Sequence, residues 1–427
     1  MNFPFLIAKR ISKSSTSGSS GSLIKIAICT ISLSIAVMLL ATSVIKGFKN
    51  GVSDKIYGFW GNIHVTDTHA SRSFELRPII NDVAIKDSIK SIGYLEYNAG
   101  PDNVNVKMSE TRGGVKSISP FITFPGILNR KSEMEGIVLK GINHEFNQDL
   151  FNEYIKEGQF PELTDSIASR GILISRQTAS RLGLGLGDRV NIHFLRDNNN
   201  IKRSLKVSGV FRTGLEEYDK KFAFVDMRFI QQLLDWNPNQ ISGYEILVDH
   251  VEDSPVIADY IYSEILPSNM YAETIQEKQS SIFQWLELQN INETVALLLM
   301  SIVAIINMIT VLLILILERS KMIGILKAIG QNDWELRKIF IYSALFILGL
   351  ALIFGNILGL GIGLLQQKFG FLKLDETNYY LSQVPIEFDF WSILSINIGA
   401  IIITALVMII PTFLVTRISP IEILRFE

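Results

Sequence analysis

Four long runs without Asp, Glu, Lys or Arg constrain this chain of 427 residues more than any other feature. They are 20 to 27 residues long and cover Ile26–Ile45, Thr294–Leu317, Ile339–Leu365 and Trp391–Val415. A bilayer core about 30 Å thick is spanned by about 20 helical residues. The hydrophobic residues, 48% of the chain, are concentrated in these runs, so we predict four membrane-spanning helices.

The first run has an alternative interpretation as a secretory signal peptide. It is longer than the apolar region of such peptides, which is usually ~7–15 residues. The small residues Ala41–Ser43 resemble a cleavage site, but the apolar run continues through them. We therefore predict a retained membrane helix.

The distribution of basic residues predicts the orientation of these helices. Cytoplasmic loops carry an excess of Lys and Arg. The segment 318–338 holds five basic residues, whereas the loop 366–390 holds two basic residues and four acidic ones. Further basic residues precede the first run and follow the last, namely Lys9, Arg10, Lys13, Lys25, Arg417 and Arg425. Both termini and the segment 318–338 are therefore predicted to be cytoplasmic.

Three lysines argue locally against this orientation, because Lys46, Lys49 and Lys55 directly follow the first run. They begin the long segment 46–293, and long domains translocate with little regard to charge. We therefore keep the predicted orientation, with this segment outside the cytoplasm.

These observations predict an α+β membrane protein, with a large mixed α/β domain between the first membrane helix and three further ones. The predicted boundaries are a cytoplasmic N-terminal segment (1–22), membrane helices (23–47, 291–317, 339–365 and 391–416), the outside domain (48–290), a cytoplasmic segment (318–338), an outside loop (366–390) and a cytoplasmic tail (417–427). Ser12–Ser22 is rich in Ser and Gly and predicts a flexible linker. The residues before it fit either an interfacial helix or a frayed terminus.

The outside domain has the patterns of both strands and helices. β-branched or alternating runs predict strands at Asn62–Asp67, Gly171–Ser175, Asp188–Leu195, Ser204–Phe211, Lys221–Asp226 and Tyr244–Asp249. The turn-rich residues Arg196–Ile201 predict a hairpin. Apolar spacing predicts helices at Arg176–Leu184, Arg228–Trp236 and Glu273–Asn290, the last running almost directly into the second membrane run.

No motif for catalysis or cofactor binding is found in the sequence. It has no Gly-x-Ser-x-Gly, no His-Glu-x-x-His and no phosphate-binding loop, so we expect no cofactor and no ATP hydrolysis by this chain. The glycines of Gly183–Arg189 follow a helix and precede a strand, the reverse of a dinucleotide site. The histidines, of which only His64 and His69 are close in sequence, form no metal-ligand cluster, and the net charge of −2 predicts no nucleic-acid partner.

The charged segment Glu318–Gly330 has the spacing of a short amphipathic helix. Met322, Ile325, Leu326 and Ile329 fall at i, i+3, i+4 and i+7, which predicts one apolar face. Gly330 suits the position just past a helix end. Asn332 with Glu335 then resembles the N-cap and N3 residues of the next helix.

Two interpretations of this apolar face remain open. In the first, the apolar face lies against lipid headgroups, and in the second, a cytoplasmic protein binds it. In the second case Arg319, Lys321 and Lys327 would supply polar contacts. The full set of candidate contact residues is Glu318, Arg319, Lys321, Met322, Ile325, Leu326, Lys327, Ile329 and Gly330.

Small and polar residues inside the membrane runs predict helix packing. Gly355, Gly359 and Gly363 form a doubled Gly-x-x-x-Gly pattern, which opens a groove for another helix, either of this chain or of a second subunit. Asn307 lies amid apolar residues of the second run, and an intramembrane polar side chain usually faces protein. We expect a dimer contact through the first and second runs, or a bond of Asn307 within its own bundle.

Several stretches resemble FtsX/MacB-type ABC transporter permeases, and within them the lipoprotein-releasing permeases of the LolC/LolE type. The resemblance covers nearly the whole chain. It rests on "FLIAKRIS…SVIKGFKNGVSDKIYGFWGNIHVTD", "LKGINHEF…IKEGQF…GILISRQTASRLGLGLGDRVNI", "FRTGLEEYDKKFAFVDMRFIQQLL", "ERSKMIGILKAIG" and "RISPIEILRFE". The fourth stretch resembles the family's coupling segment, although Met322 replaces the usual second acid.

The resemblance implies a multi-pass permease of the cell inner membrane that works with a second copy or a paralogue. A separate ABC ATPase subunit would bind ATP and push on the coupling segment. Stiff helices would carry the movement to a MacB-like periplasmic domain with an inserted lobe at about 135–215, a mechanism called mechanotransmission.

Among the functions that this resemblance allows, we expect the release of membrane lipoproteins. The alternatives are an FtsX-like regulator of cell-wall hydrolases, whose outside domain is usually smaller, and a component of a MacB-like efflux system, whose closest relatives carry a fused ATPase. Family members that dock a soluble carrier can have a long, proline-containing hairpin. The corresponding residues 193–207 are short and polar and lack proline, so a periplasmic carrier stays an open partner.

Overall fold

The computed structural model describes residues 4, 7–8, 19–69, 77–99, 107–130, 133–163, 168–196 and 199–413. The chain divides into two compact units, which are described separately. The helical unit comprises 1–51, 285–374 and 383–427, and the sheet unit comprises 52–284 and 375–382. The predicted N-terminal linker, the residues 9–10 and the cytoplasmic tail lie mostly or wholly outside the described residues.

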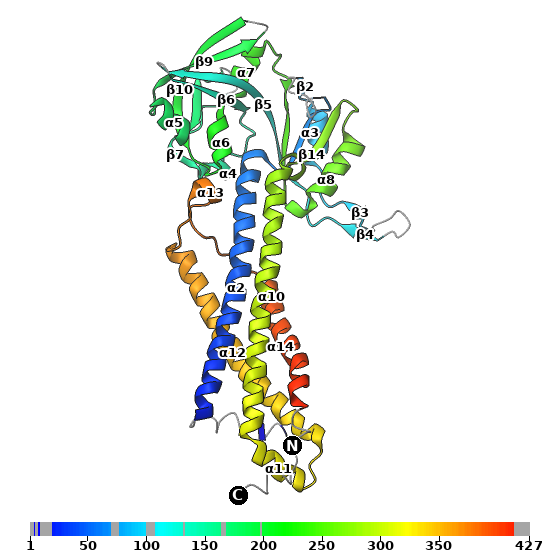
Figure 1. Cartoon of the computed structure of the whole chain (residues 1–427). Helices are drawn as coiled ribbons and strands as arrows, with labels where there is room; N and C mark the ends of the chain where they lie inside the picture. Colours follow the sequence, from blue (N-terminus) through cyan, green and yellow to red (C-terminus); the bar gives the residue numbers. More distant parts are fainter. Residues whose placement is uncertain are drawn as a thin grey trace. The chain divides into compact units, whose positions relative to one another are not determined.

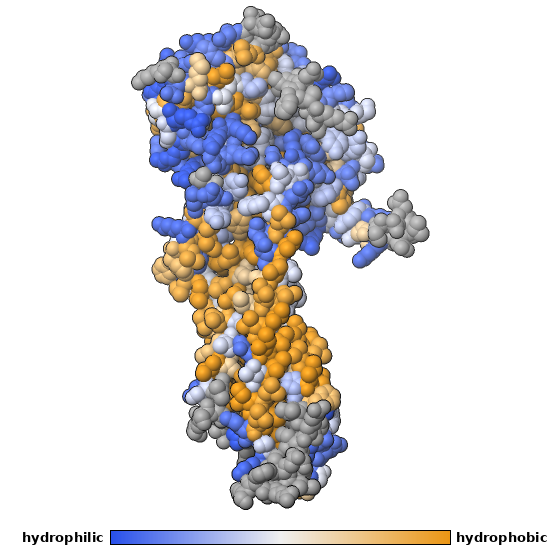
Figure 2. Space-filling model, in the orientation of Figure 1, coloured by the Kyte–Doolittle hydropathy of each residue, from blue (hydrophilic) through white to orange (hydrophobic). Residues whose placement is uncertain are grey.

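Four helices are long and apolar enough to cross a membrane, which confirms the predicted arrangement of one helix before the α/β domain and three after it. They are α2 (Ser19–Trp60), α10 (Ser280–Glu318), α12 (Asp333–Phe369) and α14 (Phe390–Thr412). Hydrophobic residues make up most of the face of the helical unit that Figure 2 shows. The described part of the chain is therefore that of a multi-pass membrane protein.

The first three helices are longer than the uncharged runs within them, because the helical backbone continues into polar sequence at one or both ends. Thus α2 extends to Trp60, and α12 begins at Asp333. A short helix, α11 (Ser320–Ala328), lies between α10 and α12 (Figure 1). The apolar core of this unit contains residues of all four long helices, together with Ile323 of α11 and Ala8 near the start of the chain.

The sheet unit is built on one large sheet. Its path is β14 (Met270–Thr274), β1 (Ile63–Asp67), β13 (Gly243–Val248), β5 (Val115–Arg130), β6 (Glu133–Ile142), β11 (Phe222–Asp226), β8 (Gly171–Ser175), β10 (Asn199–Phe211) and β7 (Ile155–Gly158), with β9 (Arg189–Arg196) pairing with β10 and β5. Two small ladders join β2 (Ile79–Ile80) to β12 (Gln240–Ile241), and β3 (Glu96–Asn98) to β4 (Met108–Glu110).

The 16-residue strand β5 joins the two halves of this sheet. Its first part pairs with β13, from Val115 to Phe121, and its second part pairs with β6, from Ile122 to Arg130. Short helices accompany the sheet: α3 (Val83–Lys90), α4 (Asp149–Asn152), α5 (Arg176–Leu182), α6 (Glu216–Lys221), α7 (Met227–Leu234), the 3₁₀ turn Val251–Asp253, α8 (Ser254–Tyr260), the π turn Ile261–Ile265, α9 (Ile275–Lys278) and α13 (Glu376–Tyr379). Of these, α3, α5, α7, α8 and the π turn contribute buried apolar side chains to one hydrophobic core with the sheet, and Figure 1 shows the helices placed around the sheet.

All six predicted strands are present, and the predicted hairpin is confirmed by antiparallel pairing of β9 with β10. One predicted helix was wrong at its start. Met270–Thr274 forms β14, paired with β1, so the helix expected over Glu273–Asn290 starts at Ile275 as α9. It is interrupted at Gln279 and resumes at Ser280 as α10. Thr274 then ends the strand and caps α9 in a capping box with Glu277.

Candidate functional site

The segment between α10 and α12 is a helix, a tight turn and the start of the next helix. The N–H of Gly330 donates to the carbonyl of Lys327 at 2.9 Å, and that of Gln331 donates to Leu326 at 3.0 Å. These two bonds form a Schellman motif, which satisfies the last carbonyls of a helix. Gly330 has a φ of +95°, a conformation that glycine adopts without the steric cost of a Cβ. The predicted role of Gly330 at the helix end is therefore confirmed.

The N-terminal cap of α12 is confirmed only in part. The side chain of Asn332 accepts a hydrogen bond from the N–H of Trp334 at 3.2 Å. The predicted reciprocal partner, Glu335, accepts instead from Lys338 at 2.7 Å. The side chain of Glu335 is thus engaged one turn along α12.

The apolar face of α11 is divided between the interior and the solvent. Met322 and Leu326 pack against the core of the helical unit, beside fully buried Ile323. In contrast, Ile325 is 51% and Ile329 is 78% exposed. At about 100° per residue the four side chains still lie on one side of the helix, and the core covers the part of that side next to Ile323.

The charged candidate contact residues of this segment also differ in how far their side chains are exposed. The Lys327 ammonium lies 3.0 Å from the Asp333 carboxylate, and its side chain is only 12% exposed. This ion pair closes the turn over Gly330, so the charge of Lys327 is used within the chain. Glu318 and Lys321 are exposed, and Arg319 is half-buried. The surface that α11 offers is therefore narrower than the sequence indicated, with Ile325 and Ile329 at its centre.

One exposed aromatic residue was missed by the sequence analysis. Trp334, in the first turn of α12, is 50% exposed. Its place among charged residues, two positions after a capping asparagine, was the available signal. A half-exposed Trp is a common anchor at protein interfaces, so we add it to the candidate contact residues.

The glycines of α12 lie where other parts of the helical unit come close. A Cβ at Gly355 would lie 2.8 Å from the carbonyl oxygen of Ser32, and one at Gly359 would lie 3.1 Å from the Cα of Ala36. Both contacts are with α2. Gly363 meets the ring of Phe388 instead. The groove is thus filled by this chain, which favours internal packing over a subunit interface for these three residues.

Asn307 is half-buried on α10, and its side chain makes no hydrogen bond with any described residue. A different polar pair joins two membrane helices. Asn356 of α12 donates to the Asn397 amide oxygen at 2.7 Å, and Asn397 of α14 donates back at 3.1 Å. The sequence analysis missed this pair, for which the signal was one asparagine in each of the two runs.

The lysines that follow the first uncharged run each have a partner. In the helical unit, Lys46 lies 3.0 Å from the carboxylate of Asp389, and Lys49 donates to Asn290 at 2.8 Å. In the sheet unit, Lys55 donates to the carbonyls of Thr213 and Tyr380. These contacts give the three lysines structural roles that account for their presence at this end of the run.

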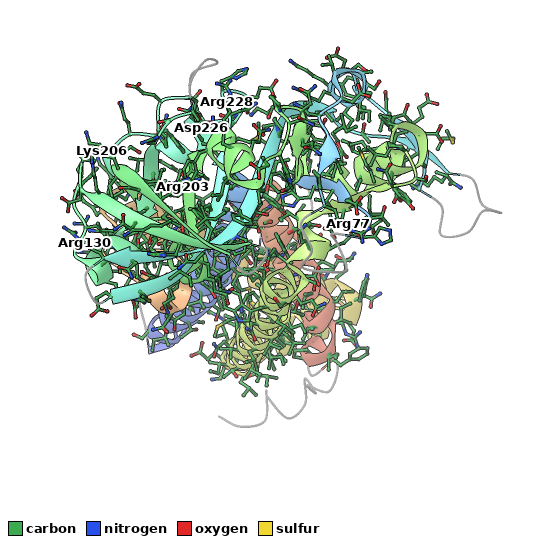
Figure 3. The ribbon with its side chains drawn as sticks, turned by 90° about the horizontal axis from the view of Figure 1, so that it is seen from above. Arg77, Arg130, Arg203, Lys206, Asp226 and Arg228 are labelled. Carbon is green, nitrogen blue, oxygen red and sulfur yellow. The ribbon has the colours of Figure 1, made fainter. Side chains whose placement is uncertain are left out.

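The hairpin of β9 and β10 presents a basic surface. The two strands pair from Asn199 opposite Arg196 to Lys206 opposite Arg189. Arg203 and Lys206 are exposed on β10, and Figure 3 shows them with Arg130 of the neighbouring strand β5. Arg130 itself forms an ion pair with Asp188 at 2.9 Å.

Four membrane helices, with a sheet domain between the first and second and a short turn helix between the second and third, define a class of membrane permeases. Residues 26–261 match the MacB-like periplasmic core domain, and residues 294–420 match the FtsX-like permease C-terminal region. The chain belongs to the family of permeases that these two regions define. This family is that of ABC transporter permeases, which act with an ATPase subunit and are not themselves the catalytic subunit.

Curated relatives align along nearly their whole length. The lipoprotein-releasing system transmembrane protein LolE of Haemophilus influenzae is 20% identical, covering 99% of each chain. The corresponding protein LolC of Buchnera aphidicola is 23% identical and covers 95% of this chain and 94% of its own. Among solved structures, the extracellular domain of the transporter YknZ from Gram-positive bacteria aligns with 50% of this chain at 13% identity, with a TM-score of 0.31.

Proposed function

We propose that this chain is the permease subunit of an inner-membrane ABC transporter that releases lipoproteins from that membrane. The sheet unit would lie in the periplasm, and the termini and α11 in the cytoplasm. A separate ATPase subunit would bind the ATP, so the permease itself needs no cofactor. The names of the full-length relatives, which belong to lipoprotein-releasing systems, support the substrate.

The need for ATP follows from the anchor of a lipoprotein. Each buried CH₂ stabilises membrane attachment by about 0.8 kcal/mol, so one ordinary acyl chain contributes on the order of 10 kcal/mol. A lipoprotein has two or three such chains, and spontaneous release is negligible. A transporter must therefore supply work and offer the chains another apolar site.

The observation that carries the proposal is the exposed pair Ile325 and Ile329 on α11. The sequence has no phosphate-binding loop, so energy from ATP must enter through contact with another protein. This pair is apolar and exposed, on a helix fixed to the bundle by Ile323. Because α11 directly joins α10 and α12, a push on it displaces two membrane helices, and α10 is one unbroken helix from Ser280 to Glu318.

The other partners follow from the same proposal. A second permease, identical or paralogous, would complete the transporter, and the half-buried Asn307 on α10 supports a contact through that helix. A periplasmic carrier that receives the lipoprotein on the β9–β10 hairpin would meet Arg203 and Lys206, so its own surface should be acidic.

The test is co-purification and release with the double variant Ile325→Glu/Ile329→Glu. Two charges at the contact should abolish association with the ATPase subunit, while insertion into the membrane is retained. The control is Met134→Glu, which places the same charge at a residue that is 68% exposed in the sheet unit. Release of a triacylated lipoprotein from proteoliposomes should require ATP with the control and be lost with the double variant. Undiminished association of the double variant would refute α11 as the docking site, and a wild-type complex that hydrolyses ATP without release would refute the substrate.

A further inference from the structure

The sheet unit holds the end of α2 at a junction of strands. After Trp60, Gly61 turns the chain with a φ of +76°, and its N–H donates to the carbonyl of Tyr57 at 2.7 Å. The strand β1 then begins at Ile63, which lies opposite Thr274 of β14. Since α9 and α10 follow β14, the strands that connect to the first and second membrane helices are neighbours in the sheet.

Side chains from the sheet take up the last carbonyls of α2. The Lys140 ammonium, from β6, donates to the carbonyl of Phe59. The ring of His64, from β1, donates through Nε2 to the carbonyl of Trp60 at 2.8 Å. The last four carbonyls of a helix lack partners within the helix, and a cation is favoured at this end by the helix dipole. Lys140 thus acts as a C-terminal cap provided by a distant strand.

Lys140 is held in place from its other side. Its Nζ lies 2.7 Å from Oε1 of Glu245 on β13, and Glu245 lies directly opposite His64 in the pairing of β13 with β1. The side chain of Lys140 is fully buried, and that of Glu245 is 5% exposed. The ammonium also lies 4.5 Å from the ring centre of Trp60 and 4.9 Å from that of Phe59. The lysine, which belongs to β6, therefore contacts α2 and β13 at once.

Stability alone does not account for this arrangement. Desolvation opposes the burial of an ion pair, and replacing such a pair by apolar side chains of similar volume is often neutral or stabilising. The surrounding rings, which include Phe146 and Phe224, could enclose an apolar side chain equally well. What an apolar side chain cannot do is bond the helix end to the sheet.

We propose that Lys140, oriented by Glu245, is a positioning residue that fastens α2 to the sheet, so that displacement of the helix moves the sheet with it. The inference rests on the proposed function, because it assigns the point at which work done on the membrane helices enters the sheet unit. Without the lysine, the helix end loses its bond to β6 and its link to Glu245. It keeps the bond from His64, the bonds of Lys55 to Thr213 and of Gln276 to Tyr57, and the apolar packing of Phe59. A displacement of α2 would then move the sheet less than it does in the wild-type protein.

The experiment uses the full-length permease with its ATPase subunit in proteoliposomes, with Lys140→Met/Glu245→Leu. The double variant removes both charges and fills the space. The complex should assemble, and ATP hydrolysis should stay within about twofold of wild type, whereas release of a triacylated lipoprotein should fall at least tenfold. As a second measurement, ATP should change amide hydrogen exchange at residues 61–65 of wild type but not of the double variant. A merely structural role would lower assembly, hydrolysis and release together.

The control is a second ion pair on the same strand. Glu135 of β6 is buried and lies 2.9 Å from Arg181 of α5, with no contact to α2 among the described residues. The variant Glu135→Leu/Arg181→Met should keep release coupled to hydrolysis. Wild-type coupling in the Lys140→Met/Glu245→Leu variant would overturn the role of Lys140 and leave the proposed function standing. A wild-type complex that releases no lipoprotein would overturn both.

Discussion

The side-chain amides of Asn356 and Asn397 bond to each other across α12 and α14, with N···O distances of 2.7 and 3.1 Å. Each amide also donates to a carbonyl of its own helix one turn earlier, that of Leu352 or Ile393. Amide pairs of this kind hold membrane helices in one register, because the surrounding lipid offers no other partners.

Loss of one member of this pair should destabilise the bundle. Asn356→Leu leaves the Asn397 amide without its partner, at a cost of about 1–2 kcal/mol. The double variant Asn356→Leu/Asn397→Leu should cost less than the sum of the two single variants, because no polar group is then left alone. Thermal unfolding in detergent measures both. Strictly additive losses would show that the two amides are not energetically coupled.

Close packing of α12 on α2 gives a second prediction. Gly355→Ala would place a Cβ 2.8 Å from the carbonyl of Ser32 and 2.9 Å from the Cβ of Ile35. The helices must move apart, which should destabilise the protein by about 1–3 kcal/mol. Gly361, on the same helix, has no atom within 4 Å of an added Cβ. The matched variant Gly361→Ala should therefore be neutral or stabilising by about 0.5–1 kcal/mol, through helix propensity. Equal melting temperatures for the two variants would contradict the packing.

The turn after α11 should be sensitive to its backbone conformation rather than to space. A Cβ at Gly330 meets no atom within 4 Å, but the φ of +95° is costly for other residues. We expect Gly330→Ala to lower stability by about 1 kcal/mol and to weaken co-purification of an ATPase subunit. Gly330→Asn should be milder, because asparagine tolerates positive φ better. If Gly330→Asn is as damaging as Gly330→Ala, the conformational explanation fails.

The four membrane helices could be predicted from the sequence, because an uncharged run of twenty or more residues is rare outside a membrane. These runs alone do not predict the polar ends by which α2, α10 and α12 extend beyond them. The strands β5 and β6 could not. β5 contains Pro120, Pro125 and Gly126, which argue against a central strand, yet it lies between β13 and β6. The local sequence pattern does not predict a strand whose place in the sheet depends on pairing with strands that are distant in the sequence.

The local sequence also does not determine which side chains of the candidate sites are buried. The spacing of Met322, Ile325, Leu326 and Ile329 located a helix, but the bundle determines which of these side chains are buried. The burial of Lys140 against Glu245 depends on strands that are about a hundred residues apart in sequence. No local signal distinguishes this lysine from a solvated one.

Chemical labelling can test the orientation of the chain in the membrane. In a Cys29→Ser background, cysteine should be introduced at Lys90 in the sheet unit or at Ala328 in α11, both of which are exposed. An impermeant thiol reagent added to intact spheroplasts should label the first and not the second, because the basic segment 318–338 is expected in the cytoplasm. Permeabilised cells supply the control, in which both sites should react. Labelling of Ala328→Cys alone in intact spheroplasts would reverse the topology.

The buried His64 should make the stability of the protein depend on pH. Burial, with help from the Lys278 and Lys140 charges, holds the pKa of His64 well below its usual value of 6.5. Its Nε2 donates to the carbonyl of Trp60, and its Nδ1 has no hydrogen-bond partner among the described residues. The nearest carboxylate, that of Glu245, lies 3.9 Å from Nε2 and is already paired with Lys140. A proton on Nδ1 would therefore be an unpaired charge in the core.

The sign of the effect follows from which state binds the proton. Below about pH 6.5 the unfolded chain protonates this histidine and the folded chain does not, so His64 makes the protein less stable as the pH falls, by up to about 1.4 kcal/mol per pH unit. His64→Gln removes this dependence, and its stability relative to wild type should rise as the pH is lowered from 7.5 to 5. The exposed control His250→Gln should follow wild type throughout. Melting temperatures of the three proteins in detergent across this range are the measurement, and a constant offset between His64→Gln and wild type would show that the folded protein protonates His64 as readily as the unfolded chain does.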